Sequence, residues 1–210
     1  QMWLHDGRLA VSYSQGRQYR SIKVAFVQPV PDPQRHYLFP RSNTPAGPTP
    51  KWKEGTLAFN GNQHLATRQT VELANDGFTL GAWLRNEGNG TLFDNRSTAP
   101  TGGILWGISG GRPYVYLGTP EHNIRSSLAL ESSRWTYTGV SIDNRRGTAT
   151  FFVNDQSETV QFTAPSPRPF QGTTAYIGNK RFESSKVAGF SGQLRHLWLY
   201  ANRQLDSSDH

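Results

Sequence analysis

The chain has 210 residues, 35% of them hydrophobic and 12% aromatic, so it can bury a sizeable core and is expected to be globular rather than disordered. It has no cysteine, which excludes disulfides, cysteine nucleophiles and thiolate metal sites. The formal net charge is +7, but residues 1–53 hold +6 of it and residues 54–210 only +1, which argues against a nucleic-acid-binding face on the second part.

The first 34 residues are predicted to form a β-hairpin extension. Residues 9–14 and 19–28 are two expected strands, joined by a turn that contains Gly16. The proline-rich residues 29–33 then interrupt the pattern. We interpret this segment as an extension or as the tail of a preceding domain. Its basic side chains could contact an acidic glycan or a neighbouring domain, although charges that protect a strand edge are the commoner explanation.

Residues 35–210 contain short runs rich in β-branched and aromatic residues, in which apolar and polar side chains alternate. The predicted strands are 36–39, 56–59, 77–85, 103–109, 113–117, 134–143, 148–154 and 192–200. Side chains two residues apart lie on one face of a strand, so each run can bury one face in a shared core. Residues 40–50 are predicted to be a surface loop, and helix is expected only as a terminal turn at 204–209. The pattern indicates an all-β, antiparallel sandwich or barrel.

Five segments carry motifs in a fixed order along most of the chain. They are residues 57–65 (Leu-Ala-Phe-Asn-Gly, then a strand), 78–84 (Phe-Thr-Leu-Gly-Ala-Trp-Leu), 134–140 (Arg-Trp-Thr-Tyr-Thr-Gly-Val), 152–156 (Phe-Val-Asn-Asp-Gln), and 177–179 with 190–205. In this order they resemble the motifs of laminin G-like domains in the concanavalin A-like superfamily. The resemblance implies a two-sheet antiparallel jelly-roll sandwich over residues 35–210, often with a carbohydrate-binding role, and it does not imply catalysis.

We predict no metal site, no cofactor and no catalytic residue. Calcium-binding laminin G-like domains have an Asp at the start of the last strand, where this sequence has Arg195, a cation that would repel calcium. Asn60, Asn62 and Asp94 could supply oxygen ligands elsewhere, but turn-stabilising hydrogen bonds explain them better. Glycoside hydrolysis needs two carboxylates about 5 to 9.5 Å apart, and the sequence has no Glu-x-Asp-x-x-Glu triplet. The histidines are dispersed, and His196 is expected on a half-exposed outer face.

Three places combine aromatic rings with amides or guanidinium groups near predicted turns. Rings stack on the apolar C–H face of a sugar, and amides or Arg bridge its hydroxyls. The candidate glycan-binding residues are Asn95, Arg96, Trp106, Tyr114, Tyr116, Asn179, Arg181 and Phe182. The competing interpretations are core packing for Trp106, a cross-strand packing pair for Tyr114 and Tyr116, and a solvated loop for residues 179–182. Three other tryptophans are assigned to the framework: Trp83, Trp135 and Trp198.

The predicted function is a noncatalytic carbohydrate-binding or adhesive module of a larger secreted or cell-surface protein. The start, Gln1-Met-Trp-Leu, is interpreted as that of a mature or excised fragment. The expected partners are a glycan or cell-surface carbohydrate, acidic ones included, and neighbouring domains, with no nucleic acid. The sequence has no run of about 18 apolar residues, so membrane insertion is not expected. A protein-interaction or structural domain stays an alternative, and a polysaccharide-degrading enzyme is a third.

Overall fold

The computed structural model describes residues 2–5, 8–14, 22–27, 35–37, 51–53, 56–71, 73–96, 102–118, 123–163, 173–179 and 188–200. The chain divides into two compact units, Gln1–Pro33 and Gln34–His210. The described residues form seventeen β-strands and no helix. No helix among these residues is long and apolar enough to cross a membrane.

The first unit contains a three-stranded antiparallel sheet. Its strands are β1 (Met2–His5), β2 (Arg8–Ser14) and β3 (Ile22–Val27), in the order β1-β2-β3. The predicted hairpin corresponds to β2 and β3, which pair from Leu9 with Val27 to Ser14 with Ile22. The short strand β1 pairs with the first part of β2 and was not predicted.

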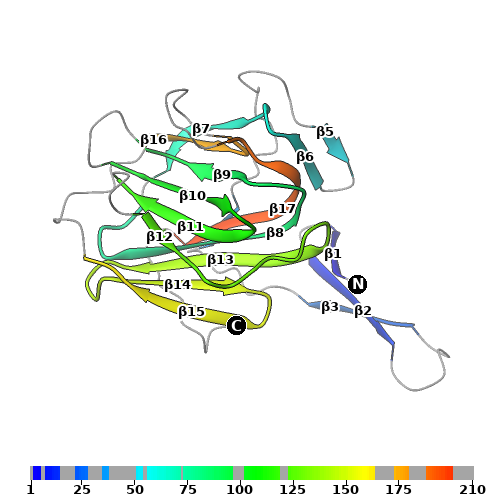
Figure 1. Cartoon of the computed structure of the whole chain (residues 1–210). Helices are drawn as coiled ribbons and strands as arrows, with labels where there is room; N and C mark the ends of the chain where they lie inside the picture. Colours follow the sequence, from blue (N-terminus) through cyan, green and yellow to red (C-terminus); the bar gives the residue numbers. More distant parts are fainter. Residues whose placement is uncertain are drawn as a thin grey trace. The chain divides into compact units, whose positions relative to one another are not determined.

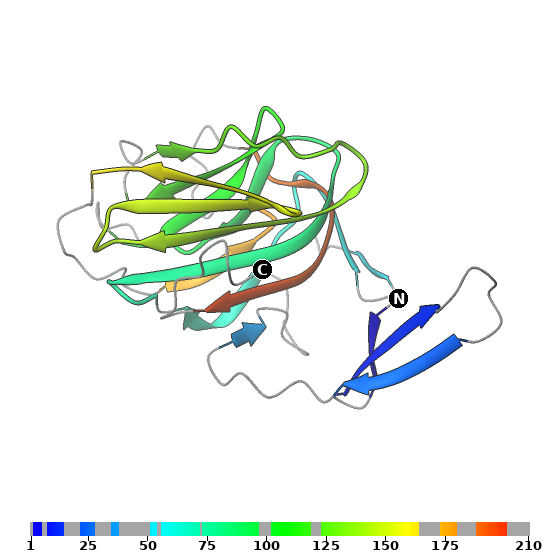
Figure 2. The same ribbon diagram turned by 90° about the horizontal axis from the view of Figure 1, so that it is seen from below.

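The second unit is a sandwich of two antiparallel sheets, as the sequence predicted (Figure 1). The eight-stranded sheet contains β4 (Arg35–Tyr37), β5 (Lys51–Lys53), β6 (Thr56–Asn60), β8 (Gly77–Asn86), β13 (Trp135–Asp143), β14 (Thr148–Val153), β15 (Gln156–Gln161) and β17 (Ser191–Tyr200). Its order is β15-β14-β13-β8-β17-β6-β5, and β4 also pairs with β17. Figure 2 shows the side of this sheet on which β13, β8 and β17 cross the view side by side.

The six-stranded sheet faces the eight-stranded one across the core. Its strands are β7 (Leu65–Val71), β9 (Gly90–Asp94), β10 (Ile104–Ser109), β11 (Arg112–Leu117), β12 (Asn123–Arg125) and β16 (Thr173–Ile177), in the order β12-β11-β10-β9-β16-β7. In this order β9 pairs with β16, although about 80 residues of the chain separate the two strands.

Alternation along each strand builds the core between the sheets. Phe78, Leu80 and Leu84 of β8 are fully buried, and Val140 and Ile142 of the neighbouring β13 join them. Each such side chain contributes roughly 1.5 to 3 kcal/mol by leaving water. The same alternation sends every second side chain to the opposite surface of its sheet, which determines where binding groups can lie.

Candidate functional site

The surface of the six-stranded sheet that turns away from the core gathers aromatic, amide and guanidinium groups. The strand registers decide which side chains share this surface, which we call the outer face. Its first row contains Asn123, Tyr116, Leu105, Asp94 and Tyr176. Its second row contains Arg125, Tyr114, Gly107 and Thr91, and Arg112 begins β11 on the same side. Because neighbouring strands lie about 4.8 Å apart, the backbone positions of Tyr116 and Tyr176 are about 14 Å apart.

A β-bulge in β9 brings its polar residues to the outer face. The pairing of β9 with β10 shifts register beside Gly107, and the consecutive residues Leu92 and Phe93 are both fully buried in the core. The residues on either side of this buried pair, Thr91 and Asp94, therefore both belong to the outer face. Strict alternation would have placed one of them in the core.

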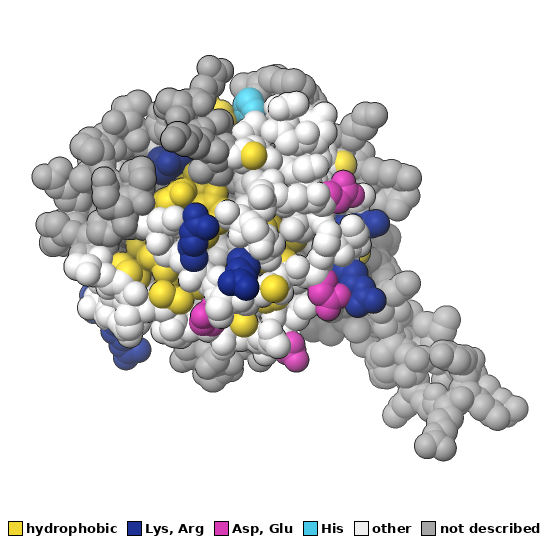
Figure 3. All heavy atoms as spheres, viewed as in Figure 1, with side chains coloured by type: hydrophobic (Ala, Val, Ile, Leu, Met, Phe, Trp, Pro, Cys, Tyr) yellow, Lys and Arg dark blue, Asp and Glu magenta, His cyan; other side chains and the backbone are white. Residues whose placement is uncertain are grey.

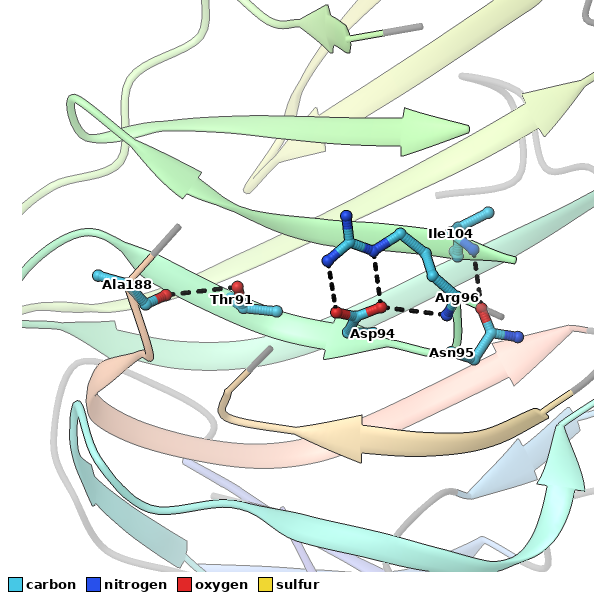
Figure 4. Close-up of polar contacts among 6 residues, drawn as sticks. All are labelled: Thr91, Asp94, Asn95, Arg96, Ile104 and Ala188. Atoms are coloured by element: carbon cyan, nitrogen blue, oxygen red, sulfur yellow. Dashed lines mark hydrogen bonds and ion pairs between the residues drawn. The ribbon is translucent and has the colours of Figure 1, made fainter. Parts of the chain in front are cut away.

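Asp94 and Arg96 form a buried ion pair on the outer face, drawn in Figure 4. The guanidinium donates from Nε to Oδ1 at 2.9 Å and from Nη2 to Oδ2 at 2.8 Å, and the Arg96 backbone N–H donates to Oδ1 at 3.1 Å. Asp94 is fully buried and Arg96 is 9% exposed. Two parallel hydrogen bonds fix the plane of the guanidinium, so Arg96 is held in one orientation at the end of β9.

Asn95 has a structural role instead of the predicted glycan-binding one. Its amide donates from Nδ2 to the Val71 carbonyl at 3.1 Å, and its Oδ1 accepts from the Ile104 backbone N–H at 2.8 Å. The side chain thereby joins β7 to β10. Because Asn95 is fully buried, it offers no surface to a sugar in this structure, and we do not include it in the candidate site.

Tyr114 and Tyr116 lie side by side on the outer face, as their spacing predicted. Their ring centroids are 5.2 Å apart and the rings are inclined by 71°. Tyr114 is only 2% exposed because it lies against Gly107, where a Cβ atom would come within 2.9 Å of its hydroxyl. Burial raises the pKa of Tyr114 well above its ordinary value, so the hydroxyl is protonated at neutral pH. Tyr116 is partly buried and keeps surface available for a ligand.

Arg125 stands exposed beside this tyrosine pair, at the edge of the sheet. Its guanidinium carbon lies 5.8 Å from the centroid of the Tyr114 ring. The Asn123 amide is oriented with its oxygen toward the guanidinium, and this oxygen accepts hydrogen bonds from Arg125 Nε at 3.1 Å and Nη2 at 3.2 Å. A hollow of about 340 Å³ opens next to both residues, between β12 and the end of β15, and Phe162 and Thr163 contribute to its lining.

Tyr176 and Arg125 also lie on the outer face, and neither was predicted from the sequence. Tyr176 is partly buried, and the partly buried ring of His64 lies 5.1 Å from its centroid. Burial lowers the pKa of His64, which favours the neutral imidazole. The polar-apolar-polar sequence at residues 123–125 was the available signal for Arg125, but three residues are too few to identify a strand.

Trp106 lies in the core and does not contribute to the outer face. It is fully buried between the sheets, because its neighbours Leu105 and Gly107 take the outward positions of β10. Its ring has no surface on which a sugar could stack, so the structure agrees with core packing, the alternative interpretation of this residue. Asn179 is partly buried against Gly189, and Arg181 and Phe182 lie outside the described residues.

The tryptophans assigned to the framework lie on the outward side of the eight-stranded sheet. The guanidinium of Arg195 stands 4.2 Å from the centroid of the Trp135 ring and 5.7 Å from that of Trp83. The ring of Trp198 is 7% exposed and lies against the backbone at Gly81, where a Cβ atom would come within 2.3 Å of it. His196 is exposed, as expected, and has a φ of 53° where β17 shifts register.

Carboxylates are sparse around the outer face. Asp94 is the sole carboxylate in the sequence of the six strands, and Arg96 engages both of its oxygens. Over the described ranges, no group of three or more His, Asp or Glu side chains could hold a metal ion. The absence of calcium stays a prediction. The arrangement suits hydrogen bonding and ring stacking, and its described residues supply no pair of facing carboxylates for hydrolysis.

The sequence from residue 59 to residue 209 matches the family model described as the concanavalin A-like lectin/glucanases superfamily, Laminin_G_3. No curated protein matches the sequence. The fold is similar to that of domain 4 of AbnA, an extracellular arabinanase from Geobacillus stearothermophilus solved with arabinotriose. The TM-score is 0.59 at 14% identity, covering 78% of this chain and 80% of that one.

Two further solved structures share the fold. A heptameric pentraxin from Limulus polyphemus has a TM-score of 0.59 at 13% identity, covering 72% of this chain and 77% of that one. Domains LG4-5 of the mouse laminin alpha1 chain have a TM-score of 0.57 at 14% identity, covering 81% of this chain and 48% of that one. At these identities the likeness concerns the fold alone.

Proposed function

Since the chain belongs to the concanavalin A-like lectin/glucanases superfamily, we propose that it binds a glycan on the outer face of the six-stranded sheet, without catalysing its cleavage. The observation that carries this proposal is the first row of the outer face. Tyr116 and Tyr176 contribute two partly buried rings to this row, and the fixed guanidinium of Arg96 lies between them. A span of about 14 Å between the backbone positions that carry the two rings suits a short oligosaccharide better than a single sugar.

Binding would combine stacking with hydrogen bonds on a surface that is already arranged. A sugar's C–H face stacks on a tyrosine ring, and its hydroxyls accept or donate hydrogen bonds at planar amides and guanidinium groups. Asp94 holds Arg96 in place before the ligand arrives, and the packing of Tyr114 against Gly107 supports the neighbouring Tyr116. A prearranged surface loses little conformational entropy on binding, which favours affinity.

A noncatalytic role fits the chemistry of this face. The one carboxylate in its six strands, Asp94, is fully buried and bonded to Arg96, so it is poorly placed to act as an acid, a base or a nucleophile. The similar domain 4 of the arabinanase AbnA was solved with arabinotriose, which supports a glycan ligand for this fold. That protein is extracellular, and we propose a module of a secreted or cell-surface protein here as well.

Protein interaction is the second candidate function. The outward side of the eight-stranded sheet carries the partly buried rings of Trp83 and Trp135 around Arg195, and such aromatic and arginine groups are enriched at protein interfaces. This role would use the sheet opposite to the glycan-binding one. Substitutions on the two sheets therefore separate the two functions.

A glycan array probed with the folded chain tests the proposal. We expect binding that is lost in Tyr116→Ala and in Tyr176→Ala, with the circular dichroism spectrum unchanged. Tyr137→Ala is the matched control, because Tyr137 is also a partly buried tyrosine but stacks on Trp198 in the other sheet. Absence of binding to every glycan, or equal binding by all three variants, would disprove a glycan site on the outer face.

A further inference from the structure

The described residues of the outer face carry more positive than negative charge. Arg96, Arg112 and Arg125 belong to it, and Asp94 is its only carboxylate within the six strands. Asp94 neutralises Arg96, which leaves two guanidinium groups on this face that no acidic side chain of the same strands balances. In Figure 3, which has the viewpoint of Figure 1, basic side chains stand near the centre of the visible surface, and both basic and acidic ones lie toward its right and lower margins.

Other exposed arginines of the sandwich have carboxylate partners. Arg134 donates to Glu131 at 2.8 Å, Arg145 pairs with Asp76, and Arg146 lies 3.7 Å from Asp143. These pairs stand at turns, where charges are well solvated. Arg125 forms no ion pair with any described residue, although it too is exposed to solvent.

Among the described carboxylates, that of Glu158 comes to this end of β12 and is engaged elsewhere. Glu158 of β15 accepts hydrogen bonds on Oε2 from the Ser126 hydroxyl and from the Ser127 backbone N–H, both at 2.6 Å. The guanidinium of Arg125 instead lies by the Tyr114 ring and the Asn123 amide, next to the 340 Å³ hollow. This volume falls in the range of small-ligand pockets, roughly 300 to 1,000 Å³.

We infer that the glycan bound at the outer face carries an acidic group, a carboxylate or a sulfate, and that Arg125 binds this group at the hollow. The inference rests on the proposed glycan-binding function. A guanidinium offers two parallel N–H groups to a planar anion, and such charged hydrogen bonds are stronger than neutral ones. The acidic substituent would sit at the β12 edge, with the sugar ring that carries it or the next one stacked on Tyr116.

Matched acidic and neutral ligands test this inference by isothermal titration calorimetry. The pairs are an oligogalacturonate against the oligogalactoside of equal length, and a sulfated oligosaccharide against its desulfated form. We expect the intact chain to bind one acidic member roughly ten- to a hundredfold more tightly than its neutral counterpart, from hydrogen bonds to a charged group. Added salt should reduce this preference, since it screens exposed charges.

Three variants assign the preference to a residue. Arg125→Gln should abolish the preference for the acidic ligand over its neutral counterpart, and Arg125→Lys should retain part of it, because an ammonium keeps the charge but lacks the planar fork. Arg134→Gln, which removes an exposed arginine elsewhere, should leave it unchanged. Equal affinity for acidic and neutral ligands, or a preference that survives Arg125→Gln, would overturn the inference and leave the glycan-binding function standing. Absence of binding to all four ligands and to the array would refute both.

Discussion

Removing the carboxylate of the buried ion pair should strongly destabilise the sandwich. Asp94→Ala would leave the Arg96 guanidinium, only 9% exposed, without the two oxygens to which it donates. Breaking a buried pair by removing one partner typically costs about 3 to 5 kcal/mol, since an uncompensated charge stays out of water. We expect a loss of this size in the free energy of unfolding, measured by urea denaturation followed by circular dichroism.

An exposed pair of the same chemistry provides the comparison. The side chains of Arg134 and Glu131 are 77% and 61% exposed, so Glu131→Ala should cost under about 1 kcal/mol. Asp94→Asn keeps one acceptor oxygen, so its loss of unfolding free energy should lie between those of Asp94→Ala and Glu131→Ala. This variant replaces Asp94→Ala in the comparison if Asp94→Ala does not fold. If Asp94→Ala and Glu131→Ala changed the unfolding free energy equally, the explanation by burial would be wrong.

Three other substitutions test the packing and the charge of the sandwich. Trp106→Ala should lower the unfolding free energy by about 3 to 5 kcal/mol in urea denaturation, because the fully buried ring would leave a cavity. Gly107→Ala should weaken glycan binding in calorimetry, since its Cβ would come within 2.9 Å of the Tyr114 hydroxyl. Partial burial opposes ionisation of Glu158, but its hydrogen bonds outweigh this and lower its pKa. The stability that ionised Glu158 gives the fold should therefore be present above pH 4.5 and be lost as the pH falls below this value. In Glu158→Gln, the urea denaturation midpoint should depend less on pH over this range.

The strands with regular alternation could be predicted, and the laminin G-like resemblance followed from their order. β8 and β13 have an apolar residue at most alternate positions, and β17 does so up to its bulge. The strands β7, β9, β12, β15 and β16, together with the short β1 and β5, were missed. In β15 both sides are largely exposed, because it is the edge strand of its sheet, and its sequence Gln-Ser-Glu-Thr-Val-Gln has little apolar pattern.

The candidate site was predicted only in part. Tyr114 and Tyr116 were expected to share a face because two residues separate them, and they do. Arg96 also proved to lie on that side, bound to Asp94, but the outward position of Asp94 depends on the register of β9 with β10, which sequence patterns did not show. Trp106 carried the same aromatic signal as the tyrosines, yet it is buried.

Local alternation is a property of neighbouring residues, so the sequence alone determined that the chain forms strands, where most of the long ones run, and that Tyr114 and Tyr116 go together. Which side of β10 meets the opposite sheet depends on its register with β9 and β11 and on the apolar surface available across the core. Those partners come from distant parts of the chain, and shifting a strand by one residue exchanges its two sides. Only the folded sandwich therefore decided that Trp106 packs inward while Arg96, Tyr116 and Arg125 meet on one surface.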